Sequence, residues 1–201
     1  MPIEIEMKVW LDDYEAVKER LSSIGDYVRS YEKTDTYWFP IQDDAPCVSI
    51  PPSGIRVRRE CGIDAGNAES KSVLVTVKKK RMAGNIEVND EREFVVSDAD
   101  LFEELICDLG LFKSMYKKKR GWEWRVPAEA EGGRTICAEI SMVKDLGWFL
   151  ELELFSDVAC EKTLSESRNG FFSLLEKLRI PEDKIEARPY AVLLRDRWNP
   201  Q

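Results

Sequence analysis

Charged and apolar residues alternate with a period of two in most segments of this chain that could form strands. The sequence begins MPIEIEMKVW, in which Glu4, Glu6 and Lys8 alternate with apolar residues. The same alternation recurs in four later segments, residues 55–59, 73–78, 136–142 and 149–154. This period is typical of β-strands that have one apolar and one polar face. We therefore expect several antiparallel strands with two chemically different faces.

The charges on these predicted strands are sorted by sign. Acids dominate the first and last strands, whereas bases dominate the middle ones. A face exposed to solvent usually mixes both signs. In addition, the pairs Arg56/Arg58 and Glu151/Glu153 each place like charges about 7 Å apart on one strand face. Such repulsion needs a counter-charge between the two residues.

Each strand taken alone is also compatible with a sheet that has one face in water. Taken together, the sorted charges favour a closed antiparallel sheet whose charged faces point inward, with helices packed on the apolar outside. The interior of such a barrel would hold a polyanion on its basic strands and a metal ion on its acidic strands.

The remaining patterns predict an α+β domain made mostly of strands. Helices are expected at residues 13–24, 97–110, 161–178 and 189–198. Strands are expected at residues 3–10, 27–39, 55–59, 72–80, 88–96, 116–126, 134–143 and 147–155. Residues 40–54 carry four prolines and are expected to form a loop, and residues 60–70 a polar turn. The length of 201 residues favours a single domain over residues 1–201.

Composition excludes several classes of function. The chain has no histidine, so a histidine base, nucleophile or metal ligand is excluded. A metal would have to bind to carboxylates, which favours Mg²⁺ or Mn²⁺ over zinc. The net charge of −8 argues against bulk nucleic-acid binding. No apolar run approaches the roughly 20 residues of a membrane span. Five scattered cysteines and the lack of a visible signal peptide favour a cytoplasmic protein.

Eight short motifs follow one another along the chain. They are EIEMK (4–8), TDTYW (34–38), GIRVR (54–58), VTVK (75–78), EREF (91–94), KKRGWEW (118–124), LGWFLELE (146–153) and PYAVLL (189–194). In this order they resemble the CYTH superfamily, the triphosphate tunnel metalloenzymes, which include class IV adenylate cyclases, thiamine triphosphatases and inorganic triphosphatases. The resemblance covers nearly the whole chain and implies a closed antiparallel eight-stranded β-barrel with a charged lumen.

The resemblance also implies roles for individual residues. A divalent cation, Mg²⁺ or Mn²⁺, would be bound by Glu4, Glu6, Glu151 and Glu153. The residues that would line the tunnel and bind phosphate oxygens are Lys8, Arg56, Arg58, Lys78, Lys118 and Arg120. Arginine suits bidentate phosphate contacts, and lysine acts as a point charge. In triphosphatases of this family a lysine or tyrosine orients the attacking water, and Lys8 and Tyr37 are the candidates for that role.

Two positions depart from the family pattern. Ser141 stands where the family usually has an aspartate that helps to hold the metal. Glu139 lies two residues earlier on the same strand face and is expected to replace that aspartate as a ligand. Asn89 stands where an arginine often precedes the paired glutamates.

The register of the basic strand at residues 117–120 is ambiguous, because all four residues, KKKR, are basic. The sequence favours Lys118 and Arg120 as the inward-facing pair. This register keeps an arginine in the tunnel and puts Trp124 at an aromatic position.

Three functions follow from these observations. The leading one is metal-dependent hydrolysis of inorganic triphosphate, thiamine triphosphate or a nucleoside triphosphate. The second is a class IV adenylate cyclase, in which the 3′-hydroxyl of ATP displaces pyrophosphate. The third is a non-catalytic module that binds triphosphate or polyphosphate. Class IV cyclases often carry a His-Phe element ahead of the glutamate motif, and its absence here favours hydrolysis.

Overall fold

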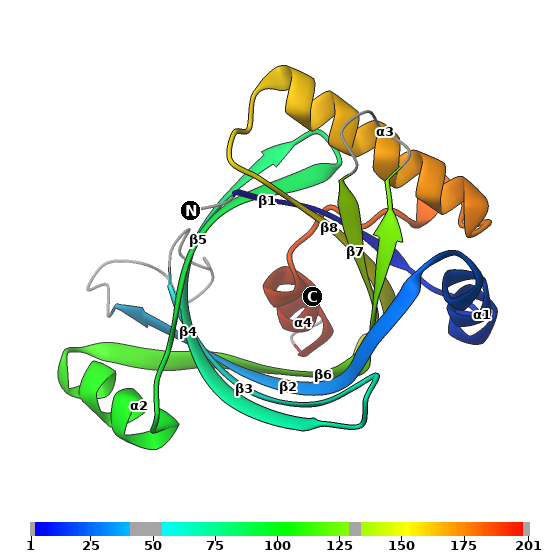
Figure 1. The fold of residues 1–201 in the computed structure, drawn as a ribbon. Coiled ribbons are helices and arrows are strands. Elements are labelled where there is room, and N and C mark those ends of the chain that lie inside the picture. Colours follow the sequence, from blue (N-terminus) through cyan, green and yellow to red (C-terminus); the bar gives the residue numbers. More distant parts are fainter. Residues whose placement is uncertain (1–2, 41–53, 129–133, 199–201) are drawn as a thin grey trace.

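The strands of this protein close into a barrel. In the computed structural model, which describes residues 3–40, 54–128 and 134–198, eight strands pair in the order β1-β5-β4-β3-β2-β6-β7-β8 and close on themselves (Figure 1). Every neighbouring pair is antiparallel. The strands are β1 Ile3–Trp10, β2 Asp26–Pro40, β3 Ile55–Asp64, β4 Glu69–Ala83, β5 Ile86–Val95, β6 Leu111–Pro127, β7 Thr135–Val143 and β8 Gly147–Ser156. The predicted closed antiparallel eight-stranded barrel is confirmed.

Four helices of the described ranges lie outside the sheet. They are α1 Tyr14–Ile24, α2 Ala99–Asp108, α3 Glu161–Lys177 and α4 Tyr190–Trp198, and a 3₁₀ turn, Glu182–Lys184, follows α3. Figure 1 shows α1, α2 and α3 around the outer surface, whereas α4 lies over the central opening of the barrel. The segment that starts α4 lines the interior cavity. Of the helices in the described ranges, none is long and apolar enough to cross a membrane.

The period-two pattern of β1 determines which way its charges point. Ile5, Met7 and Val9 are at most 1% exposed and pack with Leu152 of β8 and Phe171 of α3 on the outside of the barrel. Burial of each such side chain stabilises the fold by about 1.5–3 kcal/mol relative to exposure. Because successive strand residues point to opposite faces, the same burial turns the charged residues of β1 into the lumen.

The prediction of a polar turn over residues 60–70 is wrong for most of that range. Strand β3 continues to Asp64, and β4 begins at Glu69. The Asp64 carboxylate accepts hydrogen bonds from the backbone N–H groups of Gly66 and Ala68, both at 2.8 Å, and so closes a tight turn. Strands pair through backbone hydrogen bonds, which require no apolar side chains. This exposed part of the sheet therefore lacks the alternation of apolar and polar residues that marks the other strands in the sequence.

The other boundaries agree with the predicted elements within three residues, except at the start of β6. This strand begins at Leu111 because it pairs with the end of β2 as far as Pro40. The predicted loop at residues 40–54 lies almost entirely outside the described residues.

Candidate active site

The barrel encloses a cavity of about 740 Å³ that is lined by side chains from all eight strands and from the start of α4. Strands β8, β1 and β5 are neighbours and contribute an acid wall, which we define as Glu4, Glu6, Glu87, Glu91, Glu151 and Glu153. Strands β3, β2 and β6 are also neighbours and contribute a basic wall, which we define as Lys33, Arg56, Arg58, Lys117 and Lys119. Strands β4 and β7 separate the two walls, so the walls face each other across the cavity.

Among the described residues, the acid wall and the neighbouring Glu139 of β7 form two groups of carboxylates that are close enough to share a metal ion. Oxygen atoms of Glu4, Glu6 and Glu153 lie within 4.8 Å of one another, and the same holds for Glu139, Glu151 and Glu153. The pairing of β1 with β8 places Glu6 directly opposite Glu153. The structure therefore brings together all five acids that the sequence nominated as metal ligands. Their oxygen donors suit Mg²⁺ or Mn²⁺.

The crowding of acids makes ionisation of this wall costly. Burial, together with the charges of Glu139 and Glu6, raises the pKa of Glu153 to about 8. Burial also raises the pKa of Glu4 well above its ordinary value, although Lys78 acts in the opposite direction. A divalent cation among these oxygens would lower both pKa values and relieve the repulsion. The donor set thus fits a hard divalent cation.

Lys78, which was predicted to bind phosphate, lies among the acids. Its Nζ atom is 2.7 Å from a carboxylate oxygen of Glu91, 3.2 Å from Glu4, 3.6 Å from Glu6 and 3.7 Å from Glu87. Burial lowers the pKa of Lys78, but these four acids outweigh burial and hold the pKa well above its ordinary value. Lys78 is thus the internal counter-ion of the acid wall, and its contact with phosphate stays a prediction.

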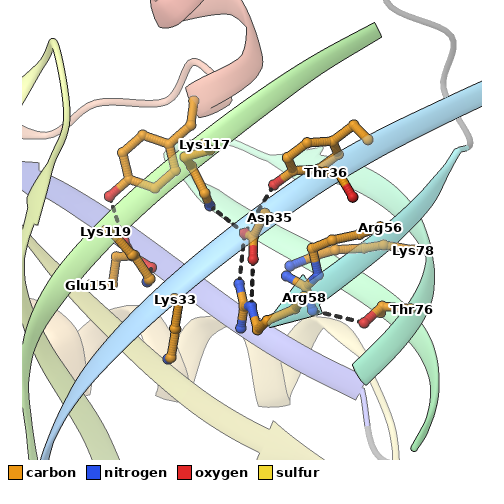
Figure 2. Close-up of polar contacts among 12 residues, drawn as sticks. Lys33, Asp35, Thr36, Arg56, Arg58, Thr76, Lys78, Lys117, Lys119 and Glu151 are labelled. Atoms are coloured by element: carbon orange, nitrogen blue, oxygen red, sulfur yellow. Dashed lines mark hydrogen bonds and ion pairs between the residues drawn. The ribbon is translucent and has the colours of Figure 1, made fainter. Parts of the chain in front are cut away.

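The basic wall depends on a buried carboxylate, Asp35. Figure 2 shows Asp35 between Arg58 and Lys117. The Arg58 Nε and Nη2 atoms donate to the two Asp35 oxygens at 2.7 and 2.9 Å, and Lys117 Nζ lies 3.1 Å from Oδ2. Burial would raise the pKa of Asp35, but the two cations hold it well below its ordinary value. Arg56 lies on the same strand as Arg58 and donates to Thr76 Oγ1 at 2.9 Å.

A second buried carboxylate, Glu139, serves the rest of the basic wall. It accepts hydrogen bonds from Lys33 at 2.6 Å, from Lys119 at 2.8 Å and from the Tyr31 hydroxyl at 2.8 Å. Burial acts to raise the pKa of Glu139, and the two lysines hold it well below its ordinary value. Lys119 also donates to Glu151 at 2.8 Å and so links the two walls. The role of Glu139 as a metal ligand stays a prediction.

The predicted register of the basic strand is wrong. Lys117 and Lys119 line the cavity and are 6% and 5% exposed, whereas Lys118 and Arg120 lie exposed on the outside of β6. The cause lies further along the strand, where Trp124 is completely buried in the outer core. Because side chains alternate between faces, burial of Trp124 puts all even-numbered residues of this part of β6 outside.

The two residues proposed to orient water, Lys8 and Tyr37, both line the cavity. Lys8 Nζ donates to the backbone oxygen of Arg188 at 2.7 Å and lies 4.3 Å from the centre of the Tyr190 ring. The Tyr37 hydroxyl lies 3.4 Å from Asp35 Oδ2. The C-terminal segment therefore touches one of the two candidates directly.

The family of the protein follows from comparison with known sequences. A model of the CYTH domain matches residues 2–190, which is nearly the whole chain. The chain belongs to the CYTH family.

Known proteins are similar to this chain in sequence or in fold over nearly their whole length. The chain is 27% identical over 202 residues to “Putative adenylate cyclase MJ0240” of Methanocaldococcus jannaschii, and the match covers 95% of this chain and 98% of that protein. A solved structure of a “putative adenylate cyclase” from Vibrio parahaemolyticus has a TM-score of 0.73 and 15% identity, with 96% and 97% of the two chains covered. A Hippeastrum protein described as a “putative adenylyl cyclase” with dominant triphosphatase activity has a TM-score of 0.62 and 13% identity, with 100% and 98% covered.

Sequence reasoning missed several residues of this CYTH site. Lys33 and Asp35 share a strand face with Tyr37, so their spacing alone could have placed them in the lumen. Glu87 likewise shares a face with Glu91. A parity argument applied to every strand, rather than to the recognised motifs alone, would have found all three.

Proposed function

We propose that this protein is a triphosphatase that hydrolyses a triphosphate substrate with the help of Mg²⁺ or Mn²⁺. The observation that carries the proposal is the pair of walls with opposite charge across one cavity. A triphosphate is a chain of anionic groups, so its oxygens match the basic wall, while a cation bound to the acid wall matches its other side. No other part of the described chain offers such a matched pair.

The basic wall is proposed to bind the phosphate oxygens. Arg56 and Arg58 offer planar guanidinium groups that suit two-point contacts, and Lys117 and Lys119 add point charges. Buried carboxylates hold Arg58, Lys117 and Lys119 in place before any ligand arrives, so little reorganisation is needed when charge shifts during phosphoryl transfer.

The acid wall is proposed to bind the cation through Glu4, Glu6 and Glu153, with Glu151 and Glu139 next to this group. When bound, the metal ion would neutralise phosphate charge that develops as the bond to the leaving group breaks. Lys8 and Tyr37 are proposed to orient the water that attacks the terminal phosphorus. That attack forms one P–O bond and breaks the bond to the bridging oxygen, which leaves with the rest of the substrate.

Cyclisation of ATP is the second candidate, because the Methanocaldococcus relative is named as an adenylate cyclase. The same walls would hold the triphosphate, and the nucleophile would be the 3′-hydroxyl of the substrate instead of water. Phosphate contacts alone do not distinguish the two reactions.

The decisive experiment incubates purified protein with Mg²⁺ or Mn²⁺ and, separately, inorganic triphosphate, thiamine triphosphate and ATP. We expect release of inorganic phosphate from at least one of them. Formation of cyclic AMP and pyrophosphate from ATP would instead support the cyclase. Tight triphosphate binding without any product would support a non-catalytic binding module.

A further inference from the structure

We infer that Asp35 is a positioning residue of this site, which orients Arg58 and Lys117 toward the triphosphate without touching the triphosphate itself. The inference rests on the proposed function, in that the cavity must bind a triphosphate. The TDTYW motif that contains Asp35 marks the strand, but its aspartate has no role in the metal or phosphate assignments made above.

The burial of Asp35 argues against direct contact with a ligand. Its side chain is 0% exposed, and both of its oxygens are already used. Oδ1 accepts from Arg58 Nε, while Oδ2 accepts from Arg58 Nη2 and pairs with Lys117 (Figure 2). Asp35 belongs to neither of the carboxylate groups that could share a metal ion. Asp35 therefore acts through its partners, which are the two cations at short range and, at 3.4 Å, the Tyr37 hydroxyl.

The geometry of the pair determines how Arg58 is presented. A guanidinium group carries its N–H donors in a rigid planar fork. Asp35 binds the edge formed by Nε and Nη2, so the Nη1 side remains for a phosphate oxygen. One two-point contact thus holds the plane of the group, whereas a single-point contact would leave it free to rotate.

Charge balance gives Asp35 a second effect. Arg58 of β3 and Lys117 of β6 are like charges on the two strands that flank β2, and the Asp35 carboxylate between them allows both to be ionised at close range. Removal of that negative charge would make the cavity more attractive to an anion but would leave the two cations unaligned. Loss of alignment by about 1 Å can lower the rate of a reaction by on the order of a hundredfold. A positioning role therefore predicts a loss in kcat without a matching loss in binding.

A matched control lies on the other face of the same part of the barrel. The Glu103 carboxylate of α2 accepts a hydrogen bond from Arg59, the residue after Arg58, at 2.9 Å. It also accepts from Thr36, the residue after Asp35. Glu103→Gln thus removes an arginine–carboxylate pair at the same level of the sheet, outside the cavity.

The test compares Asp35→Asn, Asp35→Glu and Glu103→Gln with the parent protein. For each variant, kcat and KM are measured with inorganic triphosphate and Mg²⁺, and the Kd of inorganic triphosphate is measured by calorimetry without metal. We expect both Asp35 variants to lose kcat by on the order of ten- to a hundredfold, with Kd within about threefold of the parent, and Glu103→Gln to change neither. The melting temperature is recorded to separate this effect from unfolding. The inference would be overturned if Asp35→Glu had the same kcat as the parent protein. It would also be overturned if, in all three variants, the loss of kcat were proportional to the loss of melting temperature.

A second arm needs no turnover and so separates this inference from the proposed function. Arg58→Gln is made in the parent and in Asp35→Asn, or in Asp35→Glu where Asp35→Asn does not fold. If Asp35 acts through Arg58, the substitution weakens triphosphate binding by a smaller factor when Asp35 is altered. If Arg58→Gln weakened triphosphate binding by the same factor in the parent protein and in the Asp35 variant, the positioning role would be overturned. Absence of turnover in the parent, with unequal factors, would overturn only the proposed hydrolysis.

Discussion

The two walls of the cavity balance their charges in opposite ways. In the basic wall two buried acids, Asp35 and Glu139, each pair with two cations. In the acid wall four carboxylates surround Lys78, and Glu151 also accepts a hydrogen bond from Lys119 of the basic wall. The basic wall thus keeps an excess of positive charge that two internal acids hold in place, whereas the acid wall holds an excess of negative charge.

The pKa values express this difference. The pKa values of Asp35 and Glu139 are held well below the ordinary range by their cations, which outweigh burial. In contrast, burial and neighbouring acids raise the pKa values of Glu4 and Glu153. The comparison indicates that the basic wall is organised before ligand binding, while the acid wall needs an external cation to become fully ionised.

Removal of a carboxylate from the acid wall is expected to have the largest effect. Glu4→Ala or Glu6→Ala should abolish turnover, because each residue supplies an oxygen to the carboxylate group proposed to position the divalent cation against the substrate. The loss is measured as phosphate release over a metal titration, with circular dichroism to verify that the variant is folded. Activity of the parent protein in excess chelator would show that the acid wall has no metal role.

Removal of one cation from the basic wall should have a smaller effect that appears in binding. Arg58→Ala is expected to weaken triphosphate binding by about 1.5–3 kcal/mol, the usual magnitude for a charge-assisted contact. Calorimetry with inorganic triphosphate measures the change. Arg59→Ala is the control, because the Arg59 side chain points away from the cavity toward Asp100 and Glu103. Equal effects from both substitutions would mean that the wall does not face the ligand.

The excess charge of the acid wall predicts a pH dependence of metal binding. With a pKa of about 8, Glu153 is mostly protonated at pH 6–7, so the metal must displace a proton. The metal concentration for half-maximal activity should therefore fall by about tenfold per pH unit between pH 6 and 7 and level off above pH 8. Glu153→Gln should weaken the dependence, although Glu4 with its raised pKa remains, and an unchanged dependence in that variant would contradict the prediction.

The same raised pKa has a consequence for the metal-free protein. Because the folded-state pKa of Glu153 lies above the ordinary value, the folded protein binds this proton more tightly than the unfolded chain does. That stabilising contribution is fully present below about pH 4.5 and is lost as the pH rises through 8. Melting temperatures of metal-free protein should fall over this range, and Mg²⁺ should reduce the fall. A flat profile would mean that Glu153 is ionised throughout.

The smallest effect is expected at Glu139, which lies between the acid wall and the basic wall. It contacts Lys33 and Lys119 of the basic wall and also lies within reach of Glu151 and Glu153. If it is a metal ligand, Glu139→Gln raises the metal concentration for half-maximal activity by several-fold, and Ser141→Asp in that variant partly restores it. If it is only a counter-ion, the metal titration is unchanged while KM for triphosphate shifts. The two titrations together assign Glu139 to one wall.

The alternation of charged and apolar residues allowed the barrel and much of its charged interior to be predicted without a structure. In β1 and β8, burial of the apolar set leaves only one possible direction for Glu4, Glu6, Glu151 and Glu153. The family motifs added the strand number and the expected ligands. Local pattern was sufficient here because every second residue of these strands is apolar.

The sequence alone could not assign residues to a strand face where charged and apolar residues do not alternate. The run KKKR at residues 117–120 has no apolar member, and its register followed from the burial of Trp124, several residues away. Nor does the sequence show that Lys78 meets acids of β1 as well as those of the adjacent strand β5, since Glu4 and Glu6 are distant from Lys78 in the chain. Pairings across a barrel depend on which strands become neighbours, and only the closed tertiary structure decides which buried charges meet.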